Sequence, residues 1–254
     1  MDCLIGYTGF VGGNLVAQRK FDVLINSKNF ETMRGAHYDR VVCAGVSAVK
    51  WQANKDPAAD WARIRPLMDV LATVTADKFV LISTIDVYST SFGVDEATDC
   101  HNPDHHAYGR HRLAFEDFCR ERFPKLTIVR LPGLFGPGLK KNVVFDLLHD
   151  NCLEMINPKS TFQFYDLRNI ADDIERAERA GLGLVNFFTE PVGVAEILVR
   201  FFPGAEVGAN PSPEVHYDMY TRHAALRGLT GRYLYTHDEV MAQLDDFIEG
   251  ERTK

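Results

Sequence analysis

The first 131 residues alternate short apolar runs with longer stretches of helical pattern, and this alternation limits the chain to few folds. The apolar runs are CLIG (3–6), DVLIN (22–26), RVVCAG (40–45), FVLIST (79–84) and LTIVRL (126–131). They are almost continuously apolar, as in the strands of a parallel sheet that is covered on both faces. The helical stretches between them include GGNLVAQRK, PAADWARIRPLMDVLATV and HRLAFEDFCRERF. The pattern therefore predicts right-handed βαβ units in a doubly wound α/β sheet.

The pattern changes after about residue 135. GPGLKKN (136–142) is typical of a loop, VVFDLLHDN (143–151) has a helical pattern, and shorter mixed elements follow as far as HDEVMAQLDDFIEG (237–250). A chain of 254 residues is long enough for one large domain with a small appended lobe. We therefore expect a core over residues 1–138 and a smaller mixed lobe over 139–254, with segments that return to the sheet.

Composition argues against several classes of protein. The net charge is −7 and no basic stripe is present, which argues against a nucleic-acid partner. No apolar run is long enough for a membrane helix, and the N-terminus lacks the basic and small-residue features of a signal peptide. The five cysteines are odd in number and lack CxxC spacing, so we expect neither a disulfide framework nor a metal site. They are expected to be reduced thiols in a cytoplasmic protein.

A glycine-rich loop follows the first apolar run directly. In IGYTGFVGGN, Gly6, Gly9 and Gly12 lie between a strand and the start of a helix. Glycines at these positions permit a tight turn and a close approach of the backbone to a pyrophosphate, while the helix N-terminus presents free N–H groups to its charge. A plain turn would also need glycine. The strand before the loop and the helix after it favour a dinucleotide site in a Rossmann-type fold.

The end of the second run bears on which dinucleotide binds. In NAD-binding proteins an acid about twenty residues after the loop holds the ribose 2′-hydroxyl. Here LINSKNFE (24–31) has Asn26, Ser27 and Lys28, and no acid precedes Glu31. A cation beside a small hydroxyl suits a 2′-phosphate, so the sequence favours NADP over NAD. The alternative is that Lys28 is only a solvated surface lysine.

Four motifs now occur in a fixed order: GYTGFVG (6–12), LISTIDVY (81–88), YGRHRLAFE (108–116) and IVRLPGLFGPG (128–138). In this order they resemble the extended short-chain dehydrogenase/reductase superfamily, in its NAD(P)-dependent epimerase/dehydratase branch, whose members act mainly on nucleotide sugars. The resemblance is strong through residue 138 and looser over residues 162–177. It implies a Rossmann-type core with a small C-terminal lobe that binds the substrate.

The resemblance also implies roles for individual residues. Tyr108 matches the active-site tyrosine, Thr84 its hydroxyl partner, and Arg112 stands where the family has a lysine. Together with the loop and the end of the second run, the residues predicted to bind the cofactor are Gly6, Thr8, Gly9, Phe10, Val11, Gly12, Asn26, Ser27, Lys28, Ala44, Gly45, Tyr108, Arg112, Pro132 and Gly133.

Four residues are predicted to contact the substrate. Asp86 stands where dehydratases of the family carry an acid. Lys141 and Asn142, beside Lys140 in the loop GPGLKKN, are placed to grip a phosphate, since lysine is a good point-charge ligand for it. Arg168, in FYDLRN, is a second anion contact. The alternatives remain open: the loop lysines only solubilise, and Arg168 is a surface salt-bridge residue.

The chemistry of Tyr108 and Arg112 follows from their spacing. A phenol with a pKa of about 10 is a poor base at neutral pH. Residues at i and i+4 of a helix project from the same face, so the Arg112 guanidinium would lie beside the phenol. A neighbouring cation favours phenolate and is expected to lower its pKa by about one unit or more. Thr84 would hold the substrate oxygen in line with the phenol.

Arginine is not lysine, and three interpretations of Arg112 stay open: a working version of the site, a slow one, or a protein that binds without turnover. The favoured function is NAD(P)-dependent hydride transfer on a nucleotide-linked or phosphorylated sugar, as an epimerase, reductase or dehydratase. The alternatives are a cofactor-binding sensor or scaffold of the same fold, and reduction of a small non-sugar ketone or aldehyde. Helices HRLAFEDFCRERF or DWARIRPLMDVL would pair in a homodimer.

Overall fold

The computed structural model describes residues 1–254, which form two compact units. The first unit comprises residues 1–89, 97–130 and 170–185. The second comprises residues 90–96, 131–169 and 186–254. Both units are therefore discontinuous in sequence: a short segment before residue 97 belongs to the second unit, and residues 170–185 return to the first.

The first unit is built on a six-stranded parallel sheet in the order β2-β1-β3-β4-β5-β9. Its strands are β1 (Asp2–Ile5), β2 (Val23–Ile25), β3 (His37–Cys43), β4 (Thr75–Thr84), β5 (Leu126–Leu131) and β9 (Leu184–Asn186). All five predicted strands are present. The short strand β9, which the sequence pattern did not single out, adds the sixth.

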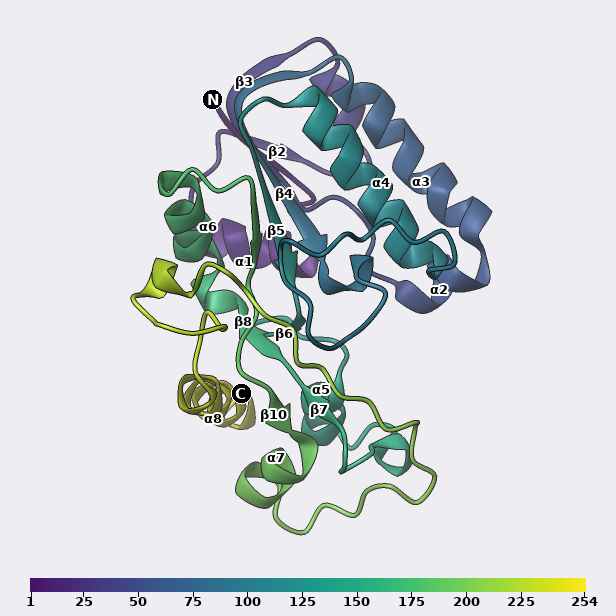
Figure 1. Ribbon diagram of the computed structural model, residues 1–254, viewed down its shortest axis with the longest axis vertical. Coiled ribbons are helices and arrows are strands. Elements are labelled where there is room, and N and C mark those ends of the chain that lie inside the picture. The colour runs from purple at the N-terminus through teal and green to yellow at the C-terminus, as the bar shows by residue number, and fades with distance from the viewer. The chain divides into compact units, whose positions relative to one another are not determined.

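Helices cover both faces of this sheet (Figure 1). On one face α1 (Phe10–Gln18) contacts α6 (Ile170–Arg179). On the other, α2 (Lys50–Lys55), α3 (Pro57–Leu71) and α4 (Ala107–Arg122) contact one another. Helices on both faces of a parallel sheet define a doubly wound α/β fold, and the predicted fold class is confirmed.

The connection between β2 and β3 is unusually short. It holds only a 3-10 turn, Phe30–Met33, where a doubly wound fold commonly has a helix and a further strand, so β2 lies at the edge of the sheet. The chain runs outward from β1 to β2 and then returns to β3 on the other side of β1. The strand order therefore reverses between β1 and β3, and in such sheets ligands bind at the carboxyl ends of the strands beside this reversal.

The core of the first unit lies between the sheet and helices α3 and α4. Val41 and Cys43 of β3 and Phe79 of β4 are at most 1 % exposed and pack with apolar residues of those helices. Cys3 is also fully buried, as expected for a small core residue. All five cysteines are free thiols, and only Cys152 is exposed.

The second unit has two small sheets and three helices. Strand β6 (Gly133–Phe135) pairs in parallel with β8 (Phe164–Asp166), and β7 (Thr161–Phe162) pairs antiparallel with β10 (Val192–Gly193). The helices are α5 (Val143–Leu148), α7 (Val194–Phe201) and α8 (His237–Arg252). Helix α8 begins with a capping box, in which Thr236 and Glu239 satisfy each other's backbone N–H groups.

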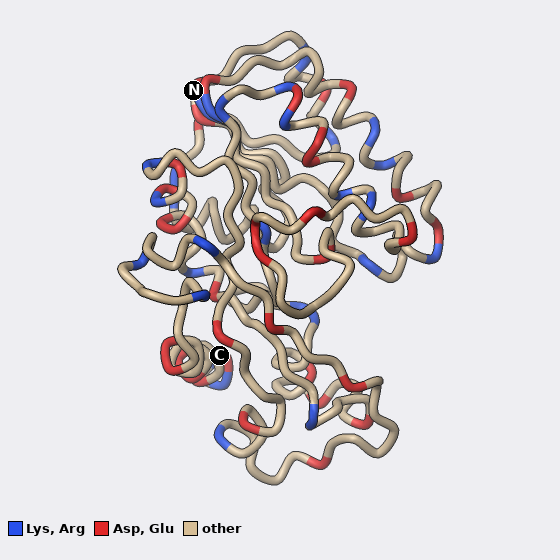
Figure 2. Tube along the Cα trace, viewed as in Figure 1, with Lys and Arg blue, Asp and Glu red and all other residues tan.

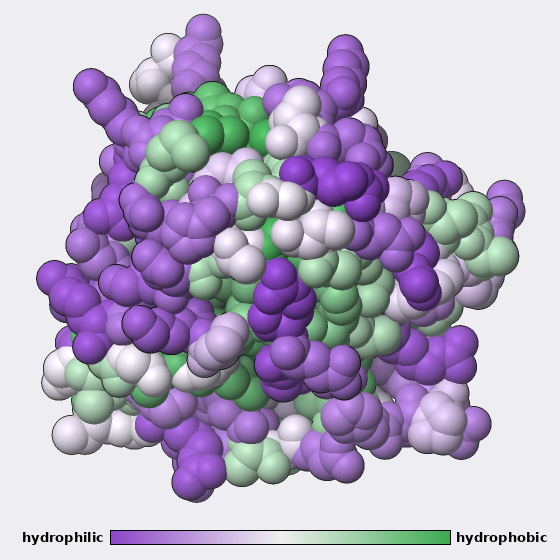
Figure 3. Space-filling view, turned by 90° about the horizontal axis from the view of Figure 1, so that it is seen from above, coloured by the Kyte–Doolittle hydropathy of each residue, from purple (hydrophilic) through white to green (hydrophobic).

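Charged residues are spread over the surface rather than gathered. Acidic and basic residues are interspersed along α3 and α4, and no basic stripe runs along either helix (Figure 2). The face in Figure 3 mixes polar side chains with smaller apolar patches. None of the helices combines the length and the apolar composition that a membrane span requires.

Candidate functional site

The glycine loop packs so closely that side chains are excluded from it. Gly6 has φ +86°, and a Cβ there would lie 2.3 Å from the carbonyl oxygen of Ala44 at the end of β3. A Cβ on Gly12 would lie 2.1 Å from the carbonyl oxygen of Gly6. The first contact fixes the loop against β3, and the second fixes α1 against the loop. Both positions therefore require glycine for backbone packing at the reversal point of the sheet.

This loop leaves a helix N-terminus open for an anion. Gly9 is the N-cap of α1 and has no side chain to cap it. The N–H groups of the first helical turn consequently lack partners within the helix. The nine-residue helix α1 directs them toward the carboxyl ends of β1 and β3, where Thr8 and Gly45 are exposed. The arrangement fits the pyrophosphate of a dinucleotide.

The end of β2 forms a tight turn around Asn26. The Lys28 N–H donates to Asn26 Oδ1 at 2.8 Å, and Asn26 Nδ2 donates to the Tyr7 hydroxyl at 3.1 Å. Asn26 therefore joins the turn to the glycine loop. Ser27 and Lys28 are exposed. A cofactor contact from Lys28 stays a prediction.

Helix α4 begins against the turn that follows β4, and this contact joins Tyr108 to Thr84. A Cβ on Gly109 would lie 2.1 Å from the carbonyl oxygen of Asp86, so the helix and the turn touch through their backbones. The Thr84 hydroxyl lies near the Tyr108 phenol and lowers its pKa, and Tyr108 is 6 % exposed. Asn54 Oδ1 accepts the Tyr108 N–H at 3.0 Å.

The Arg112 guanidinium is bound on two sides by protein groups. It stacks over the Tyr108 ring, with its Cζ 3.9 Å from the ring centroid. Both of its terminal nitrogens donate to the buried Asp60 of α3, one of them at 3.0 Å to Oδ1, and one also donates to the Ser47 carbonyl. His111 Nδ1 lies 2.8 Å from Asp60 Oδ2. Arg112 is 5 % exposed, so this ion pair is nearly dry.

The pKa of Tyr108 is raised above its ordinary value. Burial is the largest cause, and Asp86 and Asp60 act in the same direction. The charge of Arg112 and the hydrogen bond from Thr84 lower the pKa but do not outweigh burial. The expected net lowering of the Tyr108 pKa is therefore wrong: Arg112 has the expected sign, but Asp60 opposes it and desolvation is larger.

A second cation, Lys50, lies in the site and pairs with Asp86. Lys50 Nζ of α2 donates to Asp86 Oδ1 at 2.5 Å. The Asp86 N–H donates to Thr84 Oγ1 at 3.1 Å, and Thr84 Oγ1 lies 3.5 Å from Asp86 Oδ2. His105 Nε2 binds the Asp86 carbonyl, and the His106 ring accepts the Gly109 N–H as the N-cap of α4. Both histidines thus have structural partners.

The other predicted substrate residues belong to the second unit. Asn142 caps α5, where its Oδ1 accepts the Phe145 N–H at 3.0 Å and its Nδ2 donates to the Leu134 carbonyl at 2.9 Å. Arg168 pairs with the buried Asp166 at 2.6 Å. The exposed Lys141 precedes Asn142 directly. A substrate contact from any of these residues stays a prediction.

Two further predicted positions, Pro132 and Gly133, lie where β5 ends and β6 begins. The Gly133 N–H donates to the Gln163 carbonyl at 3.1 Å, and a Cβ on Gly133 would lie 2.9 Å from that oxygen. Trp51 is 64 % exposed and borders an open depression formed by α2 and the start of α3.

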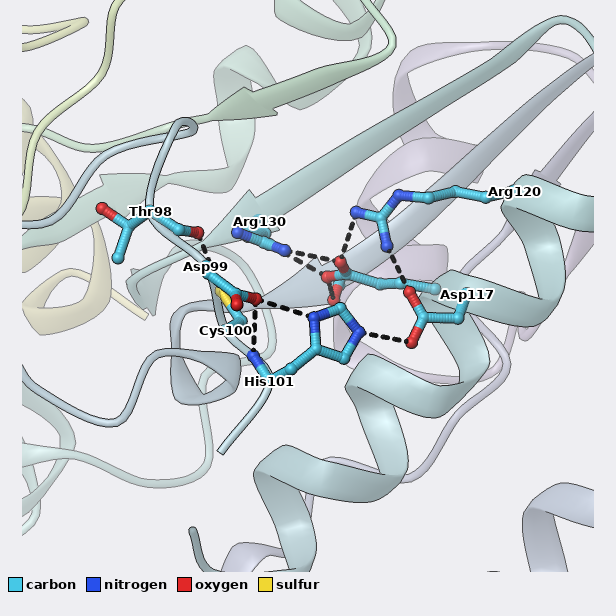
Figure 4. A network of polar contacts seen from close by, with 9 residues as sticks. Thr98, Asp99, Cys100, His101, Asp117, Arg120 and Arg130 are labelled. Atoms are coloured by element: carbon cyan, nitrogen blue, oxygen red, sulfur yellow. Dashed lines mark hydrogen bonds and ion pairs between the residues drawn. The ribbon is translucent and has the colours of Figure 1, made fainter. Parts of the chain in front are cut away.

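A second buried ion pair fastens α4 to β5. Arg130 donates to both oxygens of the fully buried Glu116, at 3.0 and 2.6 Å, and the Ser83 hydroxyl donates to Glu116 at 2.5 Å. Arg120 extends the network at the surface, where it binds Glu116 and Asp117. Figure 4 shows how His101 ties the segment before α4 to this helix through Asp117, which Arg120 of the same helix also binds.

His101 should make the attachment of this segment sensitive to pH. Its ring contacts Asp99 at 2.7 Å and Asp117 at 3.1 Å, and these hydrogen bonds raise its pKa, Asp99 having the larger effect. The stabilisation is therefore complete below the unfolded pKa of about 6.5 and is lost as the pH rises through the folded value. The side chains of His101 and Asp99 are largely exposed and that of Asp117 is partly exposed, so the effect is small. We expect His101→Gln to destabilise the protein below about pH 6 and to have little effect above pH 8, in urea unfolding at both pH values; an equal effect at both would contradict the ion pair.

Sequence reasoning missed Lys50, Asn54, Asp60 and Glu116. They are charged or polar residues within helices, and nothing in their local pattern distinguishes them from solvated residues. One signal was available for Asp60: an arginine in the register of Tyr108 on a buried helix face needs a carboxylate partner. Only the packing of α3 against α4 identifies which carboxylate supplies it.

Comparison with known proteins places this chain in a family. The model of the NAD dependent epimerase/dehydratase family matches residues 18–157, more than half of the chain. None of the curated proteins matches the sequence significantly.

Solved structures of similar fold cover nearly the whole chain. UDP-glucose 4-epimerase from the hyperthermophilic eubacterium Thermotoga maritima, with UDP-glucose, is 16 % identical with a TM-score of 0.71, over 100 % of this chain and 99 % of its own. An NAD-dependent NDP-hexosamine 5,6-dehydratase of tunicamycin biosynthesis is 18 % identical with a TM-score of 0.74, over 100 % and 98 %. The dTDP-4-dehydrorhamnose reductase of Bacillus anthracis, with NADP, is 16 % identical with a TM-score of 0.73, over 98 % and 97 %. At these identities the likeness concerns the fold.

Proposed function

This chain belongs to the NAD-dependent epimerase/dehydratase family, and from that premise we propose that it binds a nicotinamide dinucleotide and uses Tyr108 for proton transfer on a nucleotide-linked or phosphorylated sugar. One observation carries the proposal. The glycine loop follows the carboxyl end of β1 and packs against the end of β3, and Thr84 ends the next strand, β4. The start of α4, which carries Tyr108, packs against the turn after β4, and these strand ends lie beside the point where the strand order reverses. This is where doubly wound sheets bind their ligands.

The cofactor is proposed from the loop and from the end of β2. Gly6, Gly9 and Gly12 would hold the pyrophosphate, with the N–H groups of α1 as donors. The similar structures include an NAD-dependent dehydratase and a reductase with NADP, which supports a nicotinamide cofactor of either type. The exposed Lys28 favours NADP, because a cation suits the 2′-phosphate.

The chain's own residues have distinct roles in the proposed chemistry. A bound nicotinamide supplies hydride transfer to or from a carbon of the substrate. Tyr108 then moves a proton on or off the oxygen of that carbon, and Thr84, whose hydroxyl lies near the phenol, orients that oxygen. Because burial raises its pKa, Tyr108 is a neutral phenol at pH 7 and is ready to donate. Arg112 holds the ring in place through its ion pair with Asp60.

The second candidate is a cofactor-binding sensor or scaffold with little turnover. The observation that favours it is the raised pKa of Tyr108, which disfavours the phenolate needed to accept a proton. Both candidates require cofactor binding, so they differ only in turnover. The epimerase, reductase and dehydratase reactions would all use the residues described for the first candidate.

Cofactor binding is the first test. We expect a fluorescence titration with NADPH and NADH to show binding, tighter for NADPH, and Gly12→Val to abolish it, because a Cβ on Gly12 would overlap the Gly6 carbonyl. Lys28→Ala should remove the preference for NADPH while retaining NADH binding. Gly250→Val is the matched control, since Gly250 lies in α8 with an ordinary helical backbone and open space where a Cβ would stand. Failure of the native protein to bind either cofactor would contradict the proposal.

A further inference from the structure

Arg112 cannot return protons to Tyr108. A guanidinium is not deprotonated in proteins, so it holds charge but does not pass protons on. Here its terminal nitrogens are also engaged by Asp60 and by the Ser47 carbonyl, and the side chain is almost wholly buried. A tyrosine that donates a proton in each cycle must recover one by another route.

A series of three polar side chains, Thr84, Asp86 and Lys50, also extends from the phenol. The Thr84 hydroxyl lies near the Tyr108 phenol, whose pKa it lowers, and 3.5 Å from Asp86 Oδ2. The second oxygen of Asp86 accepts from Lys50 Nζ at 2.5 Å. A hydroxyl both donates and accepts, and a carboxylate has two oxygens, so each group can receive a proton on one side and release it on the other. The contact between Thr84 and Asp86 is longer than that between Asp86 and Lys50.

Lys50 connects this series of polar groups with solvent. Its side chain retains 42 % of its exposure, whereas that of Asp86 retains 22 % and Tyr108 is buried. His106 is the other titratable group that faces Asp86, but its Nε2 lies 3.9 Å from Oδ1 and its Nδ1 caps α4. His105 binds only the Asp86 backbone. Lys50 is therefore the titratable group in closest contact with the Asp86 carboxylate.

We infer that Lys50 and Asp86 form a proton relay that connects Thr84 and Tyr108 with solvent. The inference rests on the proposed function in its reductive direction, in which Tyr108 donates a proton to the substrate oxygen and recovers none from the substrate. When Tyr108 gives its proton to the substrate oxygen, its phenolate oxygen takes the Thr84 proton, and Thr84 takes one from Asp86. Asp86 takes one from the Lys50 ammonium, which takes one from water. One proton enters at Lys50 for each one that leaves at Tyr108.

Lys50→Arg separates proton transfer from charge. Arginine keeps the ion pair with Asp86 but does not release a proton. In steady-state turnover of a nucleotide sugar, Lys50→Arg and Lys50→Met should both lower kcat, up to about 100-fold, with little change in KM. Lys55→Gln, an exposed lysine of the same helix, should match the native protein. A Lys50→Arg enzyme with the native kcat would overturn the relay while leaving the proposed function intact.

The coupling can also be measured without cofactor or substrate. The tyrosinate absorbance of Tyr108 is obtained over a pH range as the difference between the native protein and Tyr108→Phe. Asp86→Asn should lower the Tyr108 pKa by about one unit and Lys50→Met should raise it, because each removes one charge near the phenol. Lys50→Arg, which keeps its charge, should leave it unchanged. An unmoved titration in both Asp86→Asn and Lys50→Met would overturn the relay even if the protein bound no nicotinamide.

Discussion

Replacing Arg112 by methionine is expected to lower the free energy of unfolding by about 3–5 kcal/mol, because it leaves the carboxylate of Asp60 buried without its cation. Asp60 is 3 % exposed, and its remaining polar side-chain contact would be with His111. The reverse change, Asp60→Leu, should cost a similar amount, because it strands the guanidinium. Urea unfolding of both variants measures the loss.

The double variant Arg112→Met with Asp60→Leu decides whether the loss belongs to the pair. Replacing both members by apolar residues removes both stranded charges, so the double variant should recover most of the stability lost by either single variant. Arg63→Met is the matched control: this exposed arginine of α3 should change stability by no more than about 0.5 kcal/mol. If the double variant lost as much free energy of unfolding as the two single variants together, the loss would not belong to the Arg112–Asp60 pair.

The same pair has a signature in pH. Burial would raise the pKa of Asp60, but hydrogen bonds from Arg112 and His111 and their charges outweigh burial and hold it below the ordinary value. The stability due to this lowered pKa is therefore present above the unfolded pKa of about 3.9 and is lost as the pH falls through the folded value. The deficit of Arg112→Met should consequently shrink at acidic pH, because Asp60 then takes a proton.

The sheet could be predicted from the sequence because each of these strands is specified by a short run of neighbouring residues. The five apolar runs specify buried parallel strands, and Gly6 and Gly12 mark the turn at which the chain must pack most tightly. Strand β9 was not predicted because its three residues are too few to form a recognisable apolar run. Thr84 and Tyr108 were assigned from motifs, and the structure brings them into contact.

The electrostatics of the site could not be predicted in this way. Asp60 lies 52 residues from Arg112, and Lys50 lies 36 from Asp86. Whether a lysine or aspartate in a polar helix is solvated or paired depends on which helix packs beside it, and spacing along the chain does not carry that information. The prediction of a lowered Tyr108 pKa was wrong for the same reason. The spacing revealed the charge of Arg112, whereas the burial that outweighs this charge arises only in the assembled fold.

Tyr108→Phe should lower kcat on a nucleotide sugar by about 10²–10⁴-fold, the range typical of a positioned proton donor, and leave the Kd for NADPH nearly unchanged. Phenylalanine keeps the ring beneath Arg112, 3.9 Å from its Cζ, and removes only the hydroxyl that binds Thr84. Tyr88→Phe is the control, since this buried tyrosine lies under Arg130. The measurements are steady-state turnover and fluorescence titration of the same samples.

A Tyr108→Phe protein with native turnover would remove the phenol from the chemistry. If native protein and variant both bind NADPH and neither turns over any sugar offered, the sensor becomes the better account, because the fold would then retain the cofactor loop without a working proton donor.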